Sequence, residues 1–317
     1  MRNLMSTNYQ GKKSVVKERA ISLFCTKKGL ILLCVLAALF TALGIFMGQK
    51  NQVKATWIWD LENLEENQEE AVSFLNNQGV NLVYLHIDLK NFNSDTFQSF
   101  IKRASDKNIE VYALGGDPNW ALTKNQESLD TFVSTVKDYN RKAEAEEKFQ
   151  GIHVDIEPYL LPEWKSDREN VVTQWINNLE HLKNQVKPGS ELTISGDVPF
   201  WINQVKIPGK NKYVGDWMIS TLDSITVMAY RDHTDGENGI KGIVSPLVEQ
   251  AANRSKSVVI AVNVIETDEG SHTTFHDNSL SYMKHELNSL DNRFSGHPGY
   301  GGVAVHDYHY WKSNQNG

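Results

Sequence analysis

The chain has 317 residues, of which 40% are hydrophobic, 22% charged and 10% aromatic, a globular composition that excludes disordered, collagen-like and low-complexity proteins. Residues 1–50 carry eight Lys or Arg and one acidic residue, a net charge of +7, whereas residues 51–317 carry 24 basic and 38 acidic residues, a net charge of −14. A body that acidic would repel phosphates, so we expect no nucleic-acid partner.

The first predicted element is a membrane-spanning helix at residues 29–48. This run of 20 residues holds no charge, and such a helix is about 30 Å long, the thickness of a hydrocarbon core. Lys27 and Lys28 precede it, so the positive-inside rule places residues 1–28 in the cytoplasm. A cleaved signal peptide is the alternative, but the run is long for one and no A-x-A site follows it. We expect a single-pass cell-membrane protein with a linker at 49–54 and an extracellular domain at 55–317.

Eight short runs rich in β-branched or aromatic residues follow, each separated from the next by enough chain for a helix. The predicted strands are 55–60, 81–88, 110–115, 151–157, 191–197, 224–230, 257–264 and 301–307. The predicted helices are 67–77, 94–107, 126–139, 168–185, 245–254 and 279–291. This α/β pattern predicts a single (β/α)₈ TIM barrel. A doubly wound open sheet is the alternative, but it would normally carry a glycine-rich loop after its first strand, and residues 55–67 contain no glycine.

The sharpest motif is His153-Val-Asp155-Ile-Glu157 in the fourth predicted strand. Side chains alternate across a strand, so the three ionisable residues share one face and the two apolar residues face the helices. Residues two apart on a strand bring their carboxylates close together. Two neighbouring carboxylates that are partly desolvated raise each other's pKa, which makes one of them a candidate acid near neutral pH. Such a pair suits glycosidic bond cleavage, where a protonated carboxyl meets the leaving oxygen. The alternative is a structural pair held by Arg or Lys.

Four motifs in chain order then resemble glycoside hydrolase family 18, the chitinase-like barrels. Residues 113–116 are Ala-Leu-Gly-Gly, where the family has Ser-x-Gly-Gly, and residues 152–157 carry the strand-four acids. Residues 228–231 are Met-Ala-Tyr-Arg, where the family has Met-x-Tyr-Asp/Asn, and residues 301–306 begin with Gly-Gly and end at a His where the family has a Trp. The order of these motifs matches over residues 55–311.

The resemblance implies three catalytic roles. Glu157 resembles the general acid that protonates the glycosidic oxygen. Asp155 resembles the acid that orients the 2-acetamido group, whose carbonyl oxygen is the nucleophile in that family. Tyr230 resembles the tyrosine that steadies this group. The resemblance implies an amino-sugar polysaccharide or oligosaccharide as substrate, and we expect no cofactor.

Three positions depart from the family pattern. The first Asp of the strand-four motif is Ile152, so the relay behind Asp155 is missing unless His153 replaces it. Arg231 follows the strand-six tyrosine, and the acid comes one position later. His306 replaces the Trp that forms the floor of the sugar subsite. These departures favour a glycosidase with a specificity other than chitin, and they leave open a direct nucleophile role for Asp155 or for a base on another strand.

Further substrate contacts are expected where the strands of a barrel end, because the active-site mouth forms there. Polar residues occupy the ends of most predicted strands, and aromatic residues follow strands three, four, five and eight. The predicted substrate-binding residues are His153, Asp60, Asp88, Asp117, Trp120, Asp197, Asp232, His306 and Trp311. For the aspartates a helix-cap or loop role is the alternative, and for the aromatics a position capping the barrel core.

Histidines near residues 272–276 and 306–309 raise the question of a metal site. A zinc site needs three or four converging ligands, and no H-E-x-x-H motif is present. Both cysteines lie within residues 1–50, so the body has no thiolate ligand. We therefore expect no metal.

Three functions follow in order of preference. The first is a membrane-anchored extracellular glycoside hydrolase that cleaves an N-acetylhexosamine or hexosamine polysaccharide by carboxylate general acid catalysis. The second is a carbohydrate-binding barrel without catalysis, suggested by the missing Asp and Trp. The third is a metal-dependent envelope amidase or deacetylase, suggested by the histidines. The oligomeric state does not follow from the sequence.

Overall fold

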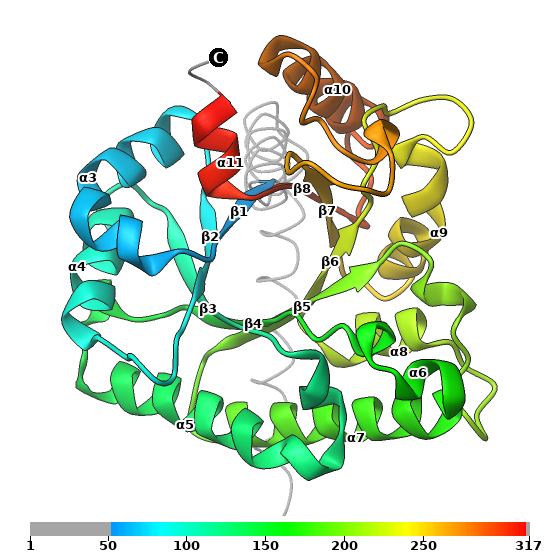
Figure 1. Ribbon diagram of the computed structural model, residues 1–317, viewed down its shortest axis with the longest axis horizontal. Coiled ribbons are helices and arrows are strands. Elements are labelled where there is room, and N and C mark those ends of the chain that lie inside the picture. Colours follow the sequence, from blue (N-terminus) through cyan, green and yellow to red (C-terminus); the bar gives the residue numbers. More distant parts are fainter. Residues whose placement is uncertain (1–51, 315–317) are drawn as a thin grey trace, which may run out of the picture. The chain divides into compact units, whose positions relative to one another are not determined.

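Residues 52–314 are described in the computed structural model, and within them eight parallel strands close into a barrel (Figure 1). The strands are β1 (Val53–Ile58), β2 (Leu82–His86), β3 (Glu110–Gly115), β4 (Gly151–Val154), β5 (Thr193–Pro199), β6 (Ser224–Met228), β7 (Val258–Asn263) and β8 (Tyr300–His306). Each strand pairs with its sequence neighbours, and β1 pairs with β8 to complete the ring. The barrel prediction is confirmed, and the open-sheet alternative is excluded.

Helices connect the strands and surround the barrel (Figure 1). They are α3 (Leu61–Asn77), α4 (Ser94–Ser105), α5 (Gln126–Lys142), α6 (Glu163–Ser166), α7 (Arg168–Val186), α8 (Val214–Thr221), α9 (Ile240–Ala252), α10 (Leu280–Arg293) and α11 (Tyr308–Ser313). All six predicted helices overlap an observed one. Helix α8 escaped prediction because it is short and apolar, with Trp217, Met218 and Ile219 buried, so it lacks the polar face that marks a surface helix.

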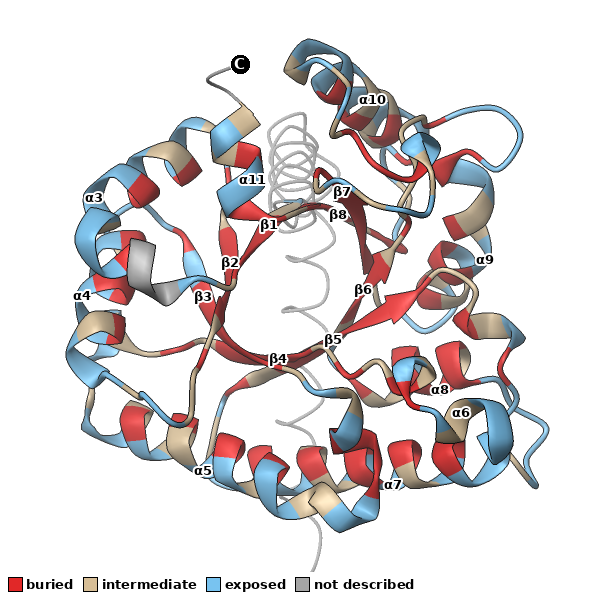
Figure 2. Ribbon diagram, viewed as in Figure 1, coloured by how far each residue is buried: buried red, intermediate tan, exposed pale blue. Residues whose placement is uncertain are grey.

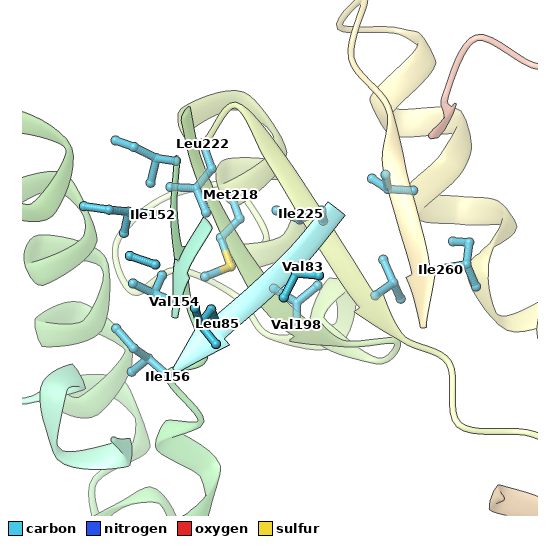
Figure 3. Close-up of a cluster of buried hydrophobic side chains, with 14 of the residues drawn as sticks. Val83, Leu85, Ile152, Val154, Ile156, Val198, Met218, Leu222, Ile225 and Ile260 are labelled. Atoms are coloured by element: carbon cyan, nitrogen blue, oxygen red, sulfur yellow. The ribbon is translucent and has the colours of Figure 1, made fainter. Parts of the chain in front are cut away.

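The buried residues form one layer outside the barrel wall and another inside it. Figure 2 shows buried residues along the strands and on the barrel-facing sides of the helices. In the outer layer Ile152, Val154 and Ile156 belong to one cluster of buried side chains that also includes Met218 of α8 (Figure 3). The inner layer is made of alanine, larger aliphatic and aromatic residues. Its members are Ala55, Trp57, Leu82, Tyr84, Tyr112, Leu114, Val259, Ala261 and Ala304. The alternation expected for strand four is therefore observed.

Most strands end one to three residues earlier than the sequence suggested, and for β4 and β6 this places the predicted catalytic residues beyond the strand. Strand β4 stops at Val154 rather than at residue 157, although the backbone N–H of Asp155 still donates to Gly115, 3.0 Å away. The backbone leaves the extended region at Glu157 (φ −109°, ψ 72°), and Pro158 follows. Strand β6 stops at Met228, two residues before its expected end. The acids therefore stand on the first residues of a loop, at the carboxyl end of the barrel.

The amino-terminal boundary differs slightly from the prediction, since β1 begins at Val53, inside the expected linker. The predicted anchor at residues 29–48 lies outside the described residues. Among the helices of residues 52–314, none is both long enough and apolar enough to cross a bilayer.

Candidate active site

The predicted catalytic residues lie together at the carboxyl end of the barrel, beside Asp197, which was predicted to bind substrate. Asp155 and Glu157 follow β4, Asp197 lies on β5, and Tyr230 follows β6. Burial raises the pKa of the Tyr230 hydroxyl well above its ordinary value, and the carboxyls of Asp197, Asp155 and Glu157 raise it further. The hydroxyl thus stays protonated amid several acids and can donate a hydrogen bond.

Glu157 is half-buried at this mouth and accepts a hydrogen bond from the hydroxyl of Tyr159. Burial raises the pKa of Glu157, the hydrogen bond from Tyr159 opposes this rise, and the charge of Glu269 adds to it. A carboxyl that keeps its proton at higher pH, and is still partly open to solvent, has the properties of a general acid.

Asp155 lies deeper than Glu157. Its Oδ1 atom is buried and has no hydrogen-bond partner within the described residues. Burial raises the pKa of this carboxyl well above its ordinary value, and the nearby charges of Asp197 and Glu157 raise it further. Its backbone packs closely against Gly116, where any Cβ atom would collide with the Asp155 carbonyl oxygen.

His153 does not reach the mouth. Its side chain is 0% exposed, stacked on Tyr84 with ring centroids 3.7 Å apart. Nδ1 lies 2.7 Å from Ser195 Oγ, and Nε2 lies 2.9 Å from Asp197 Oδ2. Burial lowers the pKa of His153 to about 3, so the ring is neutral. The prediction that His153 contacts substrate is therefore replaced by a role in holding its neighbours.

The hydrogen-bonded series of Ser195, His153 and Asp197 has the residue types of a nucleophilic triad. Ser195 is only 2% exposed, however, and lies in the barrel interior. A nucleophile must reach its substrate, so this series is structural. Asp197 is 4% exposed, and its Oδ2 atom also accepts from Trp57 Nε1, 3.0 Å away, so it too lies beneath the mouth rather than on it.

His306 ends β8 and belongs to the mouth, as predicted. Trp59 Nε1 lies 3.2 Å from His306 Nε2 and donates to it. The imidazole stacks on Tyr230, with centroids 6.1 Å apart, and meets Trp57 edge-on at 5.3 Å. Burial lowers the pKa of His306 to about 4, so this ring is also neutral. A neutral imidazole between aromatic rings therefore stands where the resemblance implied a Trp.

The remaining predicted aspartates lie around the rim. Asp88 accepts from the Lys90 backbone at 2.8 Å and from Asn91 at 2.7 Å, so it closes a loop turn. Asp117 caps a short 3₁₀ turn by accepting from the Asn119 backbone at 2.7 Å. Asp232 lies 2.7 Å from His233 Nδ1. These contacts match the loop and cap roles named as the alternative.

A hollow of about 550 Å³ opens at the ends of β1 and β2. Its lining includes Trp59, Asp60, His86 and Asp88. Asp60 and Asp88, which are 28 positions apart in sequence, thus line one recess beside an aromatic ring.

The predicted aromatic residues divide into two groups. Trp120 packs on Phe132 with centroids 5.4 Å apart, and Trp311 packs on Phe74 at 5.6 Å. Both are buried, so they belong to the core and not to the predicted sugar-binding rim. The half-buried rings of Tyr159, Trp164 and Trp201 cluster in the loops that follow β4 and β5. The ring centroids of Tyr159 and Trp201 are 5.1 Å apart. An aromatic rim is present after β4 and β5.

Sequence reasoning missed three residues that shape the site, namely Trp57, Trp59 and Tyr84, and it did not pair Tyr159 with Glu157. Ala55 and Trp57 in β1 and Trp59 just after it are two residues apart, a spacing that puts them on one face. Tyr84 lies on β2, and nothing in the sequence around it indicates that it stacks on His153. Tyr159 follows Glu157 by two residues, and only the loop conformation brings its hydroxyl back to the acid.

Within residues 52–314, no three His, Cys, Asp or Glu side chains come together in a group that could hold a metal ion.

Known proteins resemble this chain in fold. No protein-family model and no curated protein sequence matches it. Among solved structures, a GH113 β-1,4-mannanase is 11% identical, with 81% of this chain and 87% of that chain covered and a TM-score of 0.52. The Bacillus cereus spore cortex-lytic enzyme SleL is 10% identical, with 83% and 73% covered and a TM-score of 0.51. A GH18 chitinase from Cycas revoluta bound to allosamidin is 14% identical, with 81% and 95% covered and a TM-score of 0.52. At this identity the likeness shows the shared barrel fold.

Proposed function

We propose that this protein is a glycoside hydrolase that cleaves an amino-sugar polysaccharide. The observation that carries the proposal is the Asp155 and Glu157 pair at the carboxyl end of β4. Both carboxyls have raised pKa values, and Glu157 is the more exposed of the two. No Lys or Arg side chain within the described residues forms an ion pair with either of them, which argues against a purely structural pair.

In this mechanism Glu157 gives its proton to the glycosidic oxygen as the bond to the sugar breaks. Protonation of the leaving oxygen is the part of the reaction that a carboxyl with a raised pKa performs well. The hydroxyl of Tyr159 holds Glu157 in one orientation before substrate arrives. After departure of the leaving group, the ionised Glu157 can accept a proton from water.

Asp155 and Tyr230 act on the other side of the anomeric carbon. By the resemblance to family 18, the 2-acetamido carbonyl oxygen of the substrate attacks that carbon. Asp155 would accept a hydrogen bond from the acetamido N–H, and the Tyr230 hydroxyl would donate one to the acetamido oxygen. Both side chains are at least half-buried and the Asp155 Oδ1 atom is fully buried, so water competes little for these hydrogen bonds.

The substrate class is supported by the neighbours and by charge. One structural neighbour is a chitinase crystallised with allosamidin, and another is described as a spore cortex-lytic enzyme. The acidic body, with a net charge of −14 over residues 51–317, suits a neutral or partly deacetylated, cationic polymer. We therefore place chitin oligomers, peptidoglycan glycan strands and de-N-acetylated hexosamine polymers first among the candidates.

The test is product release by the full chain in detergent on these three substrates and on β-mannan. We expect wild type to cut one amino-sugar polymer and Glu157→Gln to lose at least about 10²-fold in rate, the usual size of general acid catalysis. Glu163→Gln, six residues past the acid, is the matched control and should retain activity. Binding of a glycan without cleavage by wild type would make the barrel a binding module, and cleavage that survives in Glu157→Gln would refute the assignment of the acid.

We also propose that the protein is a single-pass membrane protein with its barrel outside the cell. The support is the uncharged run at 29–48 behind Lys27 and Lys28. Protease treatment of intact cells should remove the barrel and leave a short membrane-bound fragment. Protection of the barrel in intact cells, with digestion only after lysis, would contradict this topology.

A further inference from the structure

We propose that Asp155 and Asp197 share one proton between their Oδ1 atoms, so that Asp197 positions Asp155 and sets its charge. Asp197 is thus a positioning residue, since it acts through Asp155. The catalytic meaning of this inference rests on the proposed function. The proton itself does not, because it can be detected without any substrate.

The strand register places the two carboxyls side by side. Strands β4 and β5 are parallel, with His153 opposite Ser195 and Val154 opposite Gly196. The next residues in each strand direction are Asp155 and Asp197. Alternation turns both toward the barrel interior, on the face that already carries the contact between His153 and Ser195.

One oxygen atom of each carboxyl has no hydrogen-bond donor within the described residues. Asp197 Oδ2 lies 3.0 Å from Trp57 Nε1 and 2.9 Å from His153 Nε2. The Oδ1 atoms of Asp155 and Asp197 are both buried without a partner within residues 52–314. Two buried oxygens that lack a donor, on neighbouring strands, are both satisfied by one shared proton.

The donors around Asp197 are all neutral. His153 carries its proton on Nε2 and accepts from Ser195 Oγ at Nδ1, because only this tautomer lets Nε2 donate to a carboxylate. Burial lowers the pKa of His153 to about 3, so the ring does not become a counter-ion near neutral pH. Two ionised carboxylates with no cation would repel each other strongly at this depth.

The other titratable groups that face the pair do not supply a cation either. They are Tyr84 from β2, Glu157 and Tyr159 from the β4 loop, and Tyr230 after β6, and next to Tyr230 lie His306 and Asp307 at the end of β8. Arg231 donates to the backbone carbonyl of Tyr230 at 2.6 Å and lies over the Phe200 ring. Burial and mutual charge raise the pKa of both carboxyls, which agrees with a pair that keeps a proton.

Sharing gives the pair a single negative charge that can move. When the substrate acetamido N–H donates to Asp155, the negative charge rests on Asp155 and the proton rests on Asp197. When the site is empty, the proton can lie nearer Asp155. The Ser195, His153 and Trp57 contacts hold Asp197 still throughout, so the charge moves without movement of the backbone.

The first test is the infrared band of protonated carboxyl groups, recorded on the full chain in detergent at neutral pH. The parent is Glu157→Gln, which removes the contribution of the acid. Adding Asp155→Asn or Asp197→Asn should each remove the same component of the band, because the new amide donates to the remaining carboxylate. The two changes together should remove no more than either alone, which is the signature of one proton between two groups. Asp138→Asn, on the exposed face of α5, should change nothing.

Two outcomes of this measurement would overturn the inference. Losses that add up in the double change would mean two separate protons. A band that neither change reduces would mean that both carboxyls are ionised.

The second test is catalytic. An amide imitates a protonated carboxyl, so Asp197→Asn should keep activity within about tenfold of wild type, whereas Asp197→Ala should lose about 10²-fold or more. The acidic limb of the pH profile should also shift in Asp197→Asn, which a merely structural role would not produce. Equal losses in both variants at unchanged melting temperature would show that Asp197 must be ionised, against the proposal. If wild type cleaves no glycan, the proposed function fails while the infrared measurement still decides the pair.

Discussion

The hydroxyl of Tyr159 donates a hydrogen bond to Glu157, two residues earlier in the loop that leaves β4. This contact lowers the pKa of Glu157 against the rise that burial causes, whereas the charge of Glu269 adds to that rise. The proposed acid is therefore adjusted by two neighbours that act in opposite directions, and each can be removed separately.

These two neighbours predict opposite shifts in the pH profile. The basic limb of kcat/KM follows loss of the Glu157 proton. Tyr159→Phe removes the hydrogen bond that lowers the pKa of Glu157, so this limb should move to higher pH. Glu269→Gln removes a charge that raises the pKa, so the limb should move to lower pH. Profiles of both variants check this, with Tyr213→Phe as a remote control. Shifts in one common direction would contradict the assignment of Glu157 as the acid.

Gly116 should be essential for the position of Asp155. A methyl group at residue 116 would collide with the carbonyl oxygen of Asp155, and that backbone carries the side chain into the site. We expect Gly116→Ala to lower kcat by about tenfold or more and to lower the melting temperature, since overpacking costs about 1–3 kcal/mol. Gly242→Ala in α9 is the matched control, because nothing lies within 4 Å of the added methyl. Normal activity in Gly116→Ala would show that this contact does not position the acid.

Trp201 should contribute to substrate affinity. Its ring is half-buried beside Tyr159 and Trp164, where it can stack on a sugar. Trp201→Ala should raise KM by about tenfold with a smaller change in kcat, since one exposed stacking contact contributes roughly 1 kcal/mol or slightly more. Kinetics on the substrate identified above measure this. A control is Tyr213→Ala, an aromatic side chain that is 41% exposed outside the rim. An unchanged KM would remove Trp201 from the binding surface.

Buried His153 should make the fold sensitive to mild acid. Its pKa is about 3 in the folded chain and about 6.5 when unfolded. Below about pH 6.5 the unfolded chain takes up a proton that the folded chain refuses, so the free energy of unfolding should fall as pH decreases, by up to about 1.4 kcal/mol per pH unit for this group. His306 acts in the same direction, and the carboxyls with raised pKa values act in the opposite direction because they bind protons in the folded state.

Comparison of variants isolates the His153 contribution. Melting temperatures of wild type and His153→Gln, taken between about pH 7 and about pH 5, should show a steeper acid loss for wild type. His181→Gln, whose histidine pairs with Asp130 at the surface, is the control and should keep the wild-type slope. Equal slopes in wild type and His153→Gln would mean that the buried ring is not a source of acid sensitivity.

Much of the fold could be predicted from local patterns in the sequence. The runs of β-branched and aromatic residues at regular spacing located all eight strands, because alternation and burial on both faces leave a short apolar signature. The motif around Asp155 and Glu157 was equally local, since residues two apart on a strand share a face. The position of these acids at the carboxyl end of β4 then followed from the barrel.

The sequence could not show which residues meet across the barrel. Asp197 is 42 positions from Asp155, and only the register of β4 and β5, which sets Val154 opposite Gly196, brings the next residues of both segments side by side. The aromatic residues after β3 and β8 looked like those after β4 and β5, yet Trp120 and Trp311 are covered by helices while Trp201 stays partly open. Burial and partner choice depend on which element packs over a residue, and that is decided by contacts between distant parts of the chain rather than by neighbours in sequence.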